Sequence, residues 1–367
     1  MTVLDLDHLA AIELPTADEE IWRYSRIGDL DLTAFHPVDT TPDVTGPIEF
    51  VEIGGETIDL FPHDTPDVFA SINLGSASQV RVVIPANKIV DGSIVITHTI
   101  PAGGALVSPR LVVEAGDNSE VTIVERFVSA GDGAALALPV LQMAVGQAAR
   151  VNYLAVNELS EQAWSLGNQQ AVGDRDSQTL LATVALGGDY ARVRTDARVS
   201  GRGASTRQVA LYFAGGNQMH DFRTTQDHDA PNTTSDLLFK GAVQDHAASV
   251  YTGLIKIREH ANGTVAYQTN RNLTLSEGAW AESVPNLDIR TNDVKCSHAS
   301  TVGPIDEDQR FYLESRGVQP EIAERLVVLG FFDEVLSQLP AHDLAGELRA
   351  RVAAKLNIGA TDEEATP

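Results

Sequence analysis

Several residue types and motifs on which many enzymes depend are scarce or missing in this chain. Its 367 residues include one cysteine, Cys296, so no disulfide can form within the chain. None of the five lysines follows a glycine, and the phosphate-binding loop G-x-x-x-x-G-K-[ST] is therefore absent. The motifs G-x-S-x-G and H-E-x-x-H are absent as well. We therefore do not expect a P-loop ATPase, a serine hydrolase or a zinc protease.

Cationic charge and long apolar runs are also scarce. The chain has 26 Lys and Arg against 51 Asp and Glu, a formal net charge of −25 at pH 7. Nucleic acids and anionic membranes are bound by cationic faces, so neither is expected as the main ligand. No run approaches the ~18 apolar residues of a membrane helix. The start, "MTVLDLDHLAAIELP", has acidic residues where a secretory signal has basic ones, so we expect a cytoplasmic protein.

Residues 1–46 are expected to form an N-terminal helical region and a linker. In "ADEEIWRYSRIGDLDL" the apolar residues Ile21, Tyr24 and Ile27 have helical spacing, and Thr16 or Asp18 fits an N-cap. The following "HPVDTTPDVTGP" is rich in Pro, Thr and Asp, which is typical of a linker.

Residues 47–303 carry the pattern of an all-β unit. Short apolar or alternating runs such as "VRVVIP", "GSIVITHTI" and "EVTIVERFV" are separated by Gly, Asn, Asp and Ser. The size favours two packed sheets or a stacked coil over a small barrel. Pattern alone leaves a sandwich and a parallel β-helix open. Because no strict repeat period is visible, a β-helix would have to be irregular.

Residues 304–367 are expected to form a helical domain. Asp306 and Gln309 have the spacing of a capping box, and Pro320 suits the first turn of the next helix. Such a small unit should pack on the β unit or on a partner. Phe331 adds an aromatic residue beside the main apolar stripe of this helix, a hint of a docking surface. That stripe comprises Ile322, Leu326, Leu329, Phe332, Leu336 and Leu339.

The single cysteine lies two residues before a histidine, in "NDVKCSHASTVG". On a strand, Cys296 and His298 would point to the same face. A thiolate and an imidazole can bind zinc, iron or copper, but only with further ligands, and an iron–sulfur cluster normally takes about four. The residues alone leave four roles open: a metal site, a nucleophile, half of a site completed by another chain, or a small buried side chain with no chemistry.

A second group of polar residues lies in "HDFRTTQDHDAPNTTSDLLFKG". Its histidines and acids are numerous enough for a metal site, but they also suit strand faces and turns, since Pro231 and Asn232 are turn formers. The structural interpretation is favoured for all of them, with a smaller chance of a role for His228. The group comprises His220, Asp221, Asp227, His228 and Asp229.

One stretch of the acidic chain is rich in arginine. In "ARVRTDARVSG" apolar and polar residues alternate, which predicts a half-buried strand. The arginines of this region either hold an anion or form cross-strand ion pairs, and we favour ion pairs. They are Arg192, Arg194, Arg198, Arg202 and Arg207.

Two long stretches resemble the SufB/SufD family, the scaffold proteins of the SUF iron–sulfur cluster assembly system. They are "TTQDHDAPNTTSDLLFKGAVQDHAASVYTGLIKI" and "AYQTNRNLTLSEGAWAESVPNLDIRTNDVKCSHASTVGPIDEDQRFYLESRG". The resemblance is dense from Val209 to Gly317 and weaker from Ile48 to Ala191. "EEIWRYSRIGDL", the modest length and the single cysteine favour the SufD branch. The chain has "CSHAS" where "CSHGA" is usual, and the alanine restricts the local backbone.

This resemblance implies a fold, partners and site residues. The implied fold is mainly β: a right-handed parallel β-helix core with small N- and C-terminal helical regions. A SufD-like chain would pair with a SufB-like chain and bind a SufC-like ATPase through Ile322, Leu326, Leu329, Phe331 and Phe332. His298 would face the partner chain where a nascent iron–sulfur cluster forms, with Cys296 beside it. A reduced flavin in the full complex is also compatible with the family.

The function implied by the resemblance is that of a scaffold subunit, and we do not expect an enzyme. ATP binding by the ATPase would move the helical domains and open the shared site, a population shift biased by nucleotide. Three alternatives remain. They are a homodimer that holds a cluster or iron between two copies of Cys296 and His298, a β-helical carbohydrate-active enzyme using Asp221, Asp227 or Asp229, and a purely structural subunit.

Overall fold

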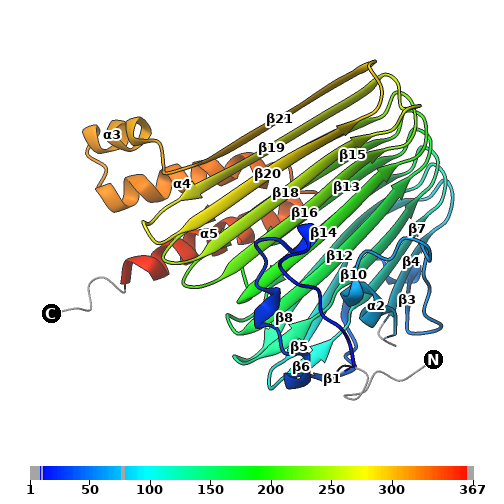
Figure 1. Cartoon of the computed structure of the whole chain (residues 1–367), viewed down its shortest axis with the longest axis horizontal. Coiled ribbons are helices and arrows are strands. Elements are labelled where there is room, and N and C mark those ends of the chain that lie inside the picture. Colours follow the sequence, from blue (N-terminus) through cyan, green and yellow to red (C-terminus); the bar gives the residue numbers. More distant parts are fainter. Residues whose placement is uncertain (1–8, 10, 76–78, 362–367) are drawn as a thin grey trace.

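Two facing β-sheets dominate the computed structural model, which describes residue 9 and residues 11–75 and 79–361 (Figure 1). In chain order, the strands of the 12-stranded sheet A are β1 His36–Pro37, β3 Val51–Ile53, β4 Gln79–Ile84, β6 Ala105–Val107, β7 Arg110–Ala115, β9 Ala135–Ala137, β10 Val140–Val145, β12 Ala163–Gly173, β14 Tyr190–Val199, β16 Met219–His228, β18 Ala248–Ile257 and β20 Trp280–Ile289. Those of the 9-stranded sheet B are β2 Asp43–Thr45, β5 Ile89–Pro101, β8 Glu120–Ala130, β11 Arg150–Glu158, β13 Gln178–Ala185, β15 Ser205–Ala214, β17 Thr234–Val243, β19 Thr264–Thr274 and β21 Val294–Gly303.

From β10 to β21, consecutive strands alternate between the two sheets. β12, β14, β16 and β18 pair side by side in parallel, and so do β13, β15, β17 and β19. The result is a flattened parallel β-helix, as predicted, and not a sandwich. Coil length varies: Asn168 pairs with Arg194, 194 − 168 = 26 residues on, and Thr252 with Val284, 284 − 252 = 32 residues on. This variation explains why the sequence has no strict repeat.

The turns from sheet A to sheet B stack on one another along one side of the solenoid. Asn118, Asp176 and Asn232 occupy these turns with φ of 55°, 57° and 57°. Asn and Asp tolerate this left-handed backbone better than other non-glycine residues. The N–H of Asp176 donates to the Arg202 carbonyl of the next coil at 3.0 Å, and adjacent turns repeat this bond. The Gly, Asn and Asp clusters between the strands are thus a structural requirement of each coil.

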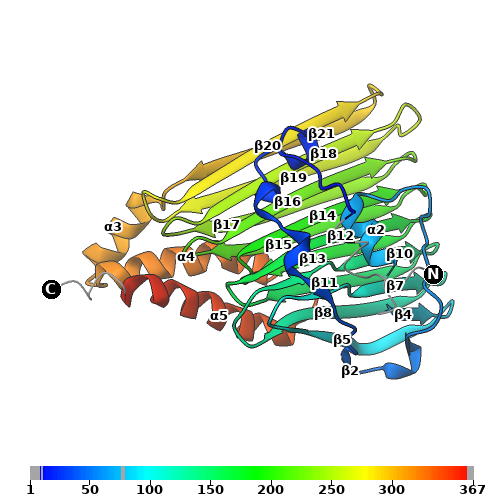
Figure 2. The same cartoon turned by 60° about the horizontal axis from the view of Figure 1, so that its bottom comes forward.

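The N-terminal segment crosses the outer face of sheet A (Figure 2). It contains three short 3-10 turns, η1 Glu20–Trp22, η2 Ile27–Asp29 and η3 Leu32–Ala34, in place of the continuous helix expected from the spacing of Ile21, Tyr24 and Ile27. Tyr24 has φ of 67°, which a right-handed helix does not allow. Burial also differs from the prediction, because Trp22 is buried and Ile21 exposed.

The segment predicted as a linker, residues 36–47, contributes strands to both sheets. β1 pairs with β6, and β2 pairs with β5. After η4 Ile48–Phe50 and β3, helix α2 Val68–Leu74 packs on the outer face of sheet A, where Phe69 and Ile72 join the core that contains Trp22.

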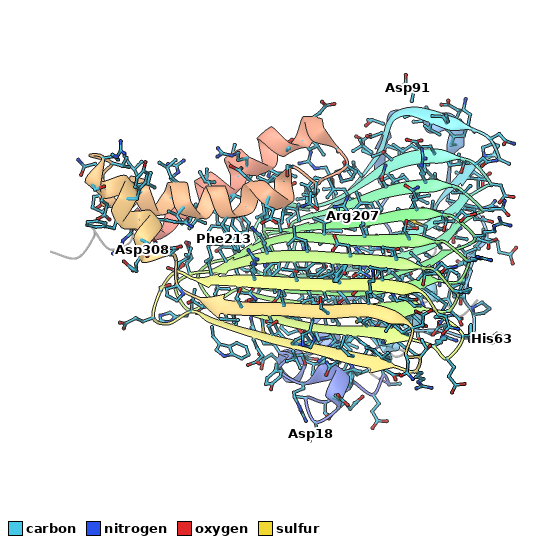
Figure 3. All side chains as sticks on the ribbon, turned by 90° about the horizontal axis from the view of Figure 1, so that it is seen from above. Asp18, His63, Asp91, Arg207, Phe213 and Asp308 are labelled. Atoms are coloured by element: carbon cyan, nitrogen blue, oxygen red, sulfur yellow. The ribbon has the colours of Figure 1, made fainter. Side chains whose placement is uncertain are left out.

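Three helices follow β21 and lie on the side of the solenoid opposite the N-terminal segment. They are α3 Glu307–Ser315, α4 Pro320–Leu336 and α5 His342–Thr361. Figure 3 shows Arg207 and Phe213 on the sheet B side, with α4 and α5, and Asp18 on the far side. The Asp306 side chain caps α3 by accepting the N–H groups of Asp308 and Gln309, and Pro320 begins α4, both as predicted.

The apolar stripe of α4 is mostly part of the protein core. Leu329 and Phe332 are buried with Val328 against Phe213 and its neighbours on sheet B. They cannot contact a partner, so their predicted docking role is wrong: the sheet buries this side of the stripe. Over the residues whose placement is described, no helix is both long enough and apolar enough to span a membrane.

Removing the Phe332 side chain should loosen the helices from sheet B. Because Phe332 is fully buried, we expect Phe332→Ala to lower the free energy of unfolding by about 3–5 kcal/mol. Phe311→Ala on α3 is the matched control, because Phe311 is 70% exposed and should cost little. Urea denaturation followed by circular dichroism measures both. Equal midpoints for the two variants would contradict this account of the helix–sheet core.

Candidate functional site

Cys296 and His298 lie on β21, the last strand of sheet B. Cys296 is in register with Ala266 on β19, and His298 with Gln268. Ala266 and Gln268 are buried between the two sheets, so the side chains of Cys296 and His298 lie on the inner face of the last coil. Two residues further on, the Ser300 hydroxyl donates to the Ser283 hydroxyl of β20 at 2.7 Å across this coil. The predicted pair therefore shares one face, at the open end of the solenoid.

The environments of the two side chains differ. Cys296 is half-buried and packs with Ile255, Ile257 and Ala266. Burial raises the pKa of the Cys296 thiol above its ordinary value, so the thiol form is favoured at neutral pH. His298 is exposed, because no further coil covers it. A half-buried thiol beside an accessible imidazole is suited to metal binding once other ligands are supplied.

This chain alone does not complete a metal site there. Across residue 9, residues 11–75 and residues 79–361, no group of three or more His, Cys, Asp or Glu side chains is placed to hold a metal ion. Cys296 and His298 give two donors, whereas an iron–sulfur cluster takes about four. The missing ligands would have to come from outside the chain.

The edge strands at the two ends of the solenoid differ in length and in pairing. At the N-terminal end, the three-residue strands β2 and β3 pair antiparallel with β5 and β4 and end the sheets. At the C-terminal end, the ten-residue strands β20 and β21 are the last strands of their sheets. Long unpaired edges are templates for pairing with another chain.

One residue on the open edge of β20 limits pairing with another strand. The N–H groups of Trp280 and Arg290 donate to Ala247 and Ile257 on the β18 side, so the even-numbered amides of β20 face β18. The odd-numbered positions face the open side, and one of them is Pro285, which has no N–H. A partner strand can pair along β20 except at this position.

Apolar side chains are exposed on the last two coils. Their number around one end of the molecule is typical of an interaction surface. The exposed apolar residues are Tyr267, Trp280, Leu287, Ile289 and Val302.

In "CSHAS", Ala299 lies within β21 and is not among the residues with positive φ, so the alanine fits the strand without strain.

A second exposed apolar surface lies on α3 and α4. Of the predicted docking residues, Ile322 and Leu326 are exposed, and Phe331 is partly covered by the Lys240 ammonium, 4.4 Å from its ring centre. Phe311 and Tyr312 on α3 are also exposed and were not predicted as docking residues, although two neighbouring aromatics on a short helix were a visible signal. We call Phe311, Tyr312, Ile322 and Leu326 the helical patch.

The second polar group of the sequence is structural. His228 is buried, and its ring nitrogens bond to the hydroxyls of Thr233 and Ser235, both at 2.8 Å. Burial lowers the pKa of His228 to about 4, against a smaller opposing effect of Asp227. His220 is also buried, and burial lowers its pKa to about 3. Neither histidine reaches a metal-ligand group among the described residues.

The acidic residues of this group form ion pairs with basic side chains. Asp221 is fully buried and pairs with Arg192. Burial raises the pKa of Asp227, but the hydrogen bonds and charge of Arg258 outweigh it, and the net shift is downward. Asp229 contacts Arg258 at 3.1 Å. A glycosidase acid needs a raised pKa, so this arrangement does not favour the carbohydrate-active alternative.

The buried histidines should make the fold sensitive to acid. Between pH 6.5 and 4 the unfolded chain protonates His228 while the folded chain does not, so stability falls as pH falls through this range. The lowered pKa of His228 corresponds to a loss of roughly 3 kcal/mol in the free energy of unfolding across this pH range. We expect His228→Asn to flatten the loss of urea midpoint between pH 7 and 4.5. His260→Asn, at an exposed turn, is the control. An unchanged slope in His228→Asn would contradict the assignment.

Comparisons with known proteins agree with this geometry. The family model for "SUF system FeS cluster assembly, SufBD core domain" matches residues 98–331. An iron–sulfur cluster assembly SufBD family protein of Mycobacterium tuberculosis (strain H37Rv) is 31% identical over 378 residues, covering 97% of this chain and 93% of the relative. The iron–sulfur cluster assembly protein SufD of Escherichia coli (strain K12) is 29% identical over 248 residues, 68% of this chain and 59% of the relative. SufD of Bacillus subtilis (strain 168) is 29% identical over 275 residues, with 74% and 63% covered. The chain belongs to the SufBD family of SUF-system iron–sulfur cluster assembly proteins.

Proposed function

We propose that this chain is the SufD-like half of a two-chain scaffold on which iron–sulfur clusters are built. The observation that carries the proposal is the unfinished last coil, which places Cys296 and His298 on the inner face of an unpaired edge. A SufB-like chain would pair its own strands with β20 and β21. Backbone hydrogen bonds would supply affinity and the exposed apolar residues would supply contact area.

The ligand count supports a shared site. Two donors from this chain and two or more from its partner would reach the number that a cluster requires. His298 would offer the nitrogen of its neutral imidazole to iron. Cys296 would have to lose its proton on binding, and iron favours this loss because it binds the thiolate. The cluster is the cargo of the site, and we propose no catalytic chemistry by this chain alone.

A SufC-like ATPase would dock on the helical patch. The patch is close in sequence to the site, because β21 ends at Gly303 and α3 begins at Glu307. A movement of α3 would therefore pull on the strand that carries His298. ATP binding would shift the population toward an arrangement in which the shared site is open to iron and sulfur. The reduced flavin compatible with the family resemblance stays a prediction.

The same open edge could instead pair with a second copy of this chain. Light scattering on the chain, alone and with SufB-type and SufC-type partners, separates the two assemblies. A complex with one copy of this chain, one SufB-type chain and two ATPases supports the hetero-scaffold. A homodimer that binds neither partner, and that holds iron and sulfide, supports the homodimeric scaffold.

Removing the imidazole should impair cluster assembly without breaking the complex. We expect His298→Ala to reduce cluster formation by the assembled scaffold at least about ten-fold, because one ligand is lost. Ser297→Ala is the control, since Ser297 is adjacent but on the opposite face of β21. Absorbance of the reconstituted cluster and the mass of the complex are measured together. Normal cluster yield in His298→Ala would refute the role of His298.

A charge on the helical patch should weaken ATPase binding. Ile322 is 52% exposed and contributes to the patch, so Ile322→Glu should raise the Kd for the ATPase at least about ten-fold by burying an unpaired charge. Ile53→Glu is a matched control, because Ile53 is 53% exposed on β3 at the other end of the solenoid. Titration calorimetry gives both values. Equal affinities for the two variants would place the ATPase elsewhere.

A further inference from the structure

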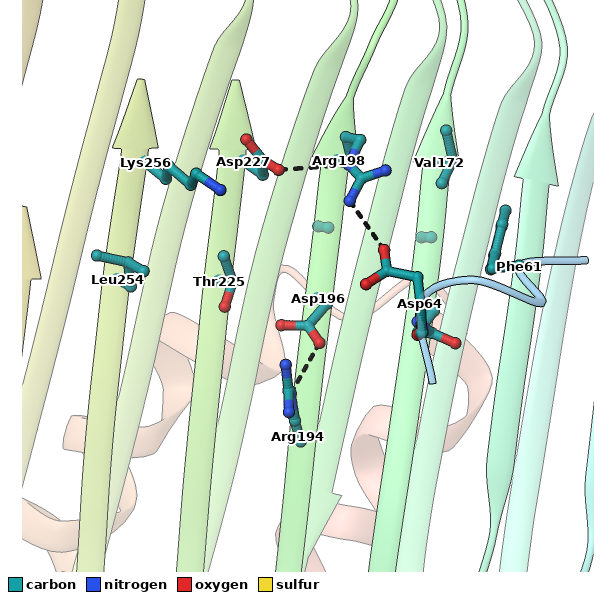
Figure 4. Close-up of a pocket in the computed structure, with 13 residues that line it drawn as sticks. Phe61, Asp64, Val172, Arg194, Asp196, Arg198, Thr225, Asp227, Leu254 and Lys256 are labelled. Carbon is teal, nitrogen blue, oxygen red and sulfur yellow. Dashed lines mark hydrogen bonds and ion pairs between the residues drawn. The ribbon is translucent and has the colours of Figure 1, made fainter. Parts of the chain in front are cut away.

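The outer face of sheet A has a groove that the proposed scaffold role does not use. It lies over β14, β16 and β18, with residues 61–64 on one side (Figure 4) and the η1 turn on the other. Two adjoining cavities, of about 250 Å³ and about 350 Å³, share Arg194, Thr225 and Leu254. Together they lie within the ~300–1,000 Å³ of typical small-molecule sites.

Two arginines lie next to each other on neighbouring strands of this groove. Arg194 and Arg223 are register partners on β14 and β16. Arg194 donates to Asp196 and to the Pro66 carbonyl, whereas the guanidinium of Arg223 donates, among the described residues, only to the backbone carbonyls of Glu20 and Arg23. In the part of the chain that the structure describes, the buried Nε of Arg223 has no hydrogen-bond partner. Like charges directly opposite on neighbouring strands are unfavourable, and an anion between them would reverse the sign of that interaction.

The electrostatics of Arg223 agree with this picture. Burial lowers the pKa of its guanidinium, and the positive charges of Arg192 and Arg194 add to the lowering, against the opposite effects of Asp221 and Tyr190. The positive charge of Arg223 is thus only partly balanced by the negative charges of the chain itself. A bound anion would supply the missing negative charge.

The groove has further free donors. Within the described part of the chain, Lys256 makes no hydrogen bond or ion pair, and its charge acts on Asp227 and Asp288 only at longer range. The hydroxyls of Thr225 and Thr252 also line the groove, and neither has a partner among the residues that the structure describes.

Two cationic centres lie at opposite ends of the groove. Arg194 and Arg223 form one, and Lys256 beside Arg198 forms the other. Arg198 is paired with Asp64 at 2.8 Å and with Asp227 at 3.3 Å, so Lys256 is the unpaired cation at this end among the described residues. They are four residues apart along the strands, which corresponds to roughly 13 Å. Leu254, Thr225 and Asp196, which pairs with Arg194, lie on the floor between them. The floor is therefore partly apolar, with a cation at each end.

We propose that this groove binds a small organic anion, with a phosphate or carboxylate held by Arg194, Arg223 and Thr252 and an apolar body that extends over Leu254 toward Lys256. Arginine forks and threonine hydroxyls bind either anionic group. Nucleic acid does not suit the groove, because Asp64, Asp196 and Asp227 line it. Cys296, His298 and the helical patch take no part, so the inference stands independently of the proposed function.

Titration calorimetry of the full chain with pyrophosphate and with citrate tests the proposal and tells phosphate from carboxylate. We expect saturable binding of at least one of them, weakened at least about five-fold in Lys256→Gln and in Thr252→Val. Lys256→Gln removes no internal hydrogen bond, so the fold should be intact, which circular dichroism checks. Arg150→Gln, an exposed arginine on sheet B with the same change in charge, should bind as the wild type does.

Three results would overturn the proposal. One is the absence of binding of either probe at millimolar concentration. Another is binding that is unchanged in both Lys256→Gln and Thr252→Val. The third is an equal loss of affinity in Arg150→Gln, because it would show an effect of net charge rather than a site.

Discussion

A parallel β-helix must end somewhere, and the way this one ends determines most of its properties. Each coil forms backbone hydrogen bonds with the coil before it, so the outer edge of the last coil has no strand of this chain to pair with. At the N-terminal end the short antiparallel strands β2 and β3 close the sheets. At the C-terminal end β20 and β21 remain open along ten residues each. The Cys-x-His pair lies on this open coil, with Cys296 half-buried and His298 exposed. We propose that a second chain completes its ligand set.

The two outer faces of the solenoid have different roles. α4 and α5 cover sheet B through Leu329, Phe332 and Val352, which attaches the helical patch firmly to the coils below. The N-terminal segment covers sheet A only in part, through Trp22 and Ile27, and leaves the cationic groove beside it. The proposed docking and cluster sites thus lie on one side and at one end of the molecule, and the proposed anion groove lies on the other side.

Local signals in the sequence predicted local structure well. Asp306 and Gln309 gave the start of α3, and the period of two along a strand put Cys296 and His298 on one face. Those features depend on neighbours within a few residues. The choice between sandwich and β-helix depends on pairing between residues such as Asn168 and Arg194, in different coils, and periodicity does not report it. The family resemblance supplied that part.

The predictions that failed did so where packing overrides a pattern. Ile21, Tyr24 and Ile27 have helical spacing, but the positive φ of Tyr24 and the burial of Trp22 against sheet A break the helix. Leu329 and Phe332 belong to an apolar stripe that the sequence alone could assign to a partner or to the core. Arg192 and Arg198 of β14 form the expected cross-strand ion pairs, with Asp221 and Asp227 of β16. Arg194 instead pairs with Asp196 on its own strand, and its register with Arg223 was not visible without the fold.

Amide hydrogen exchange on β20 and β21 tests the central claim most directly. In the isolated chain, the amides of Ser283 and Leu287 face the open side of β20. They should exchange quickly, because no neighbouring strand accepts a hydrogen bond from them. On addition of a SufB-type chain they should become protected, while amides of β12 and β14 stay unchanged. A stable complex in which the β20 and β21 amides exchange as fast as before would show that the partner binds elsewhere, and would contradict the shared site.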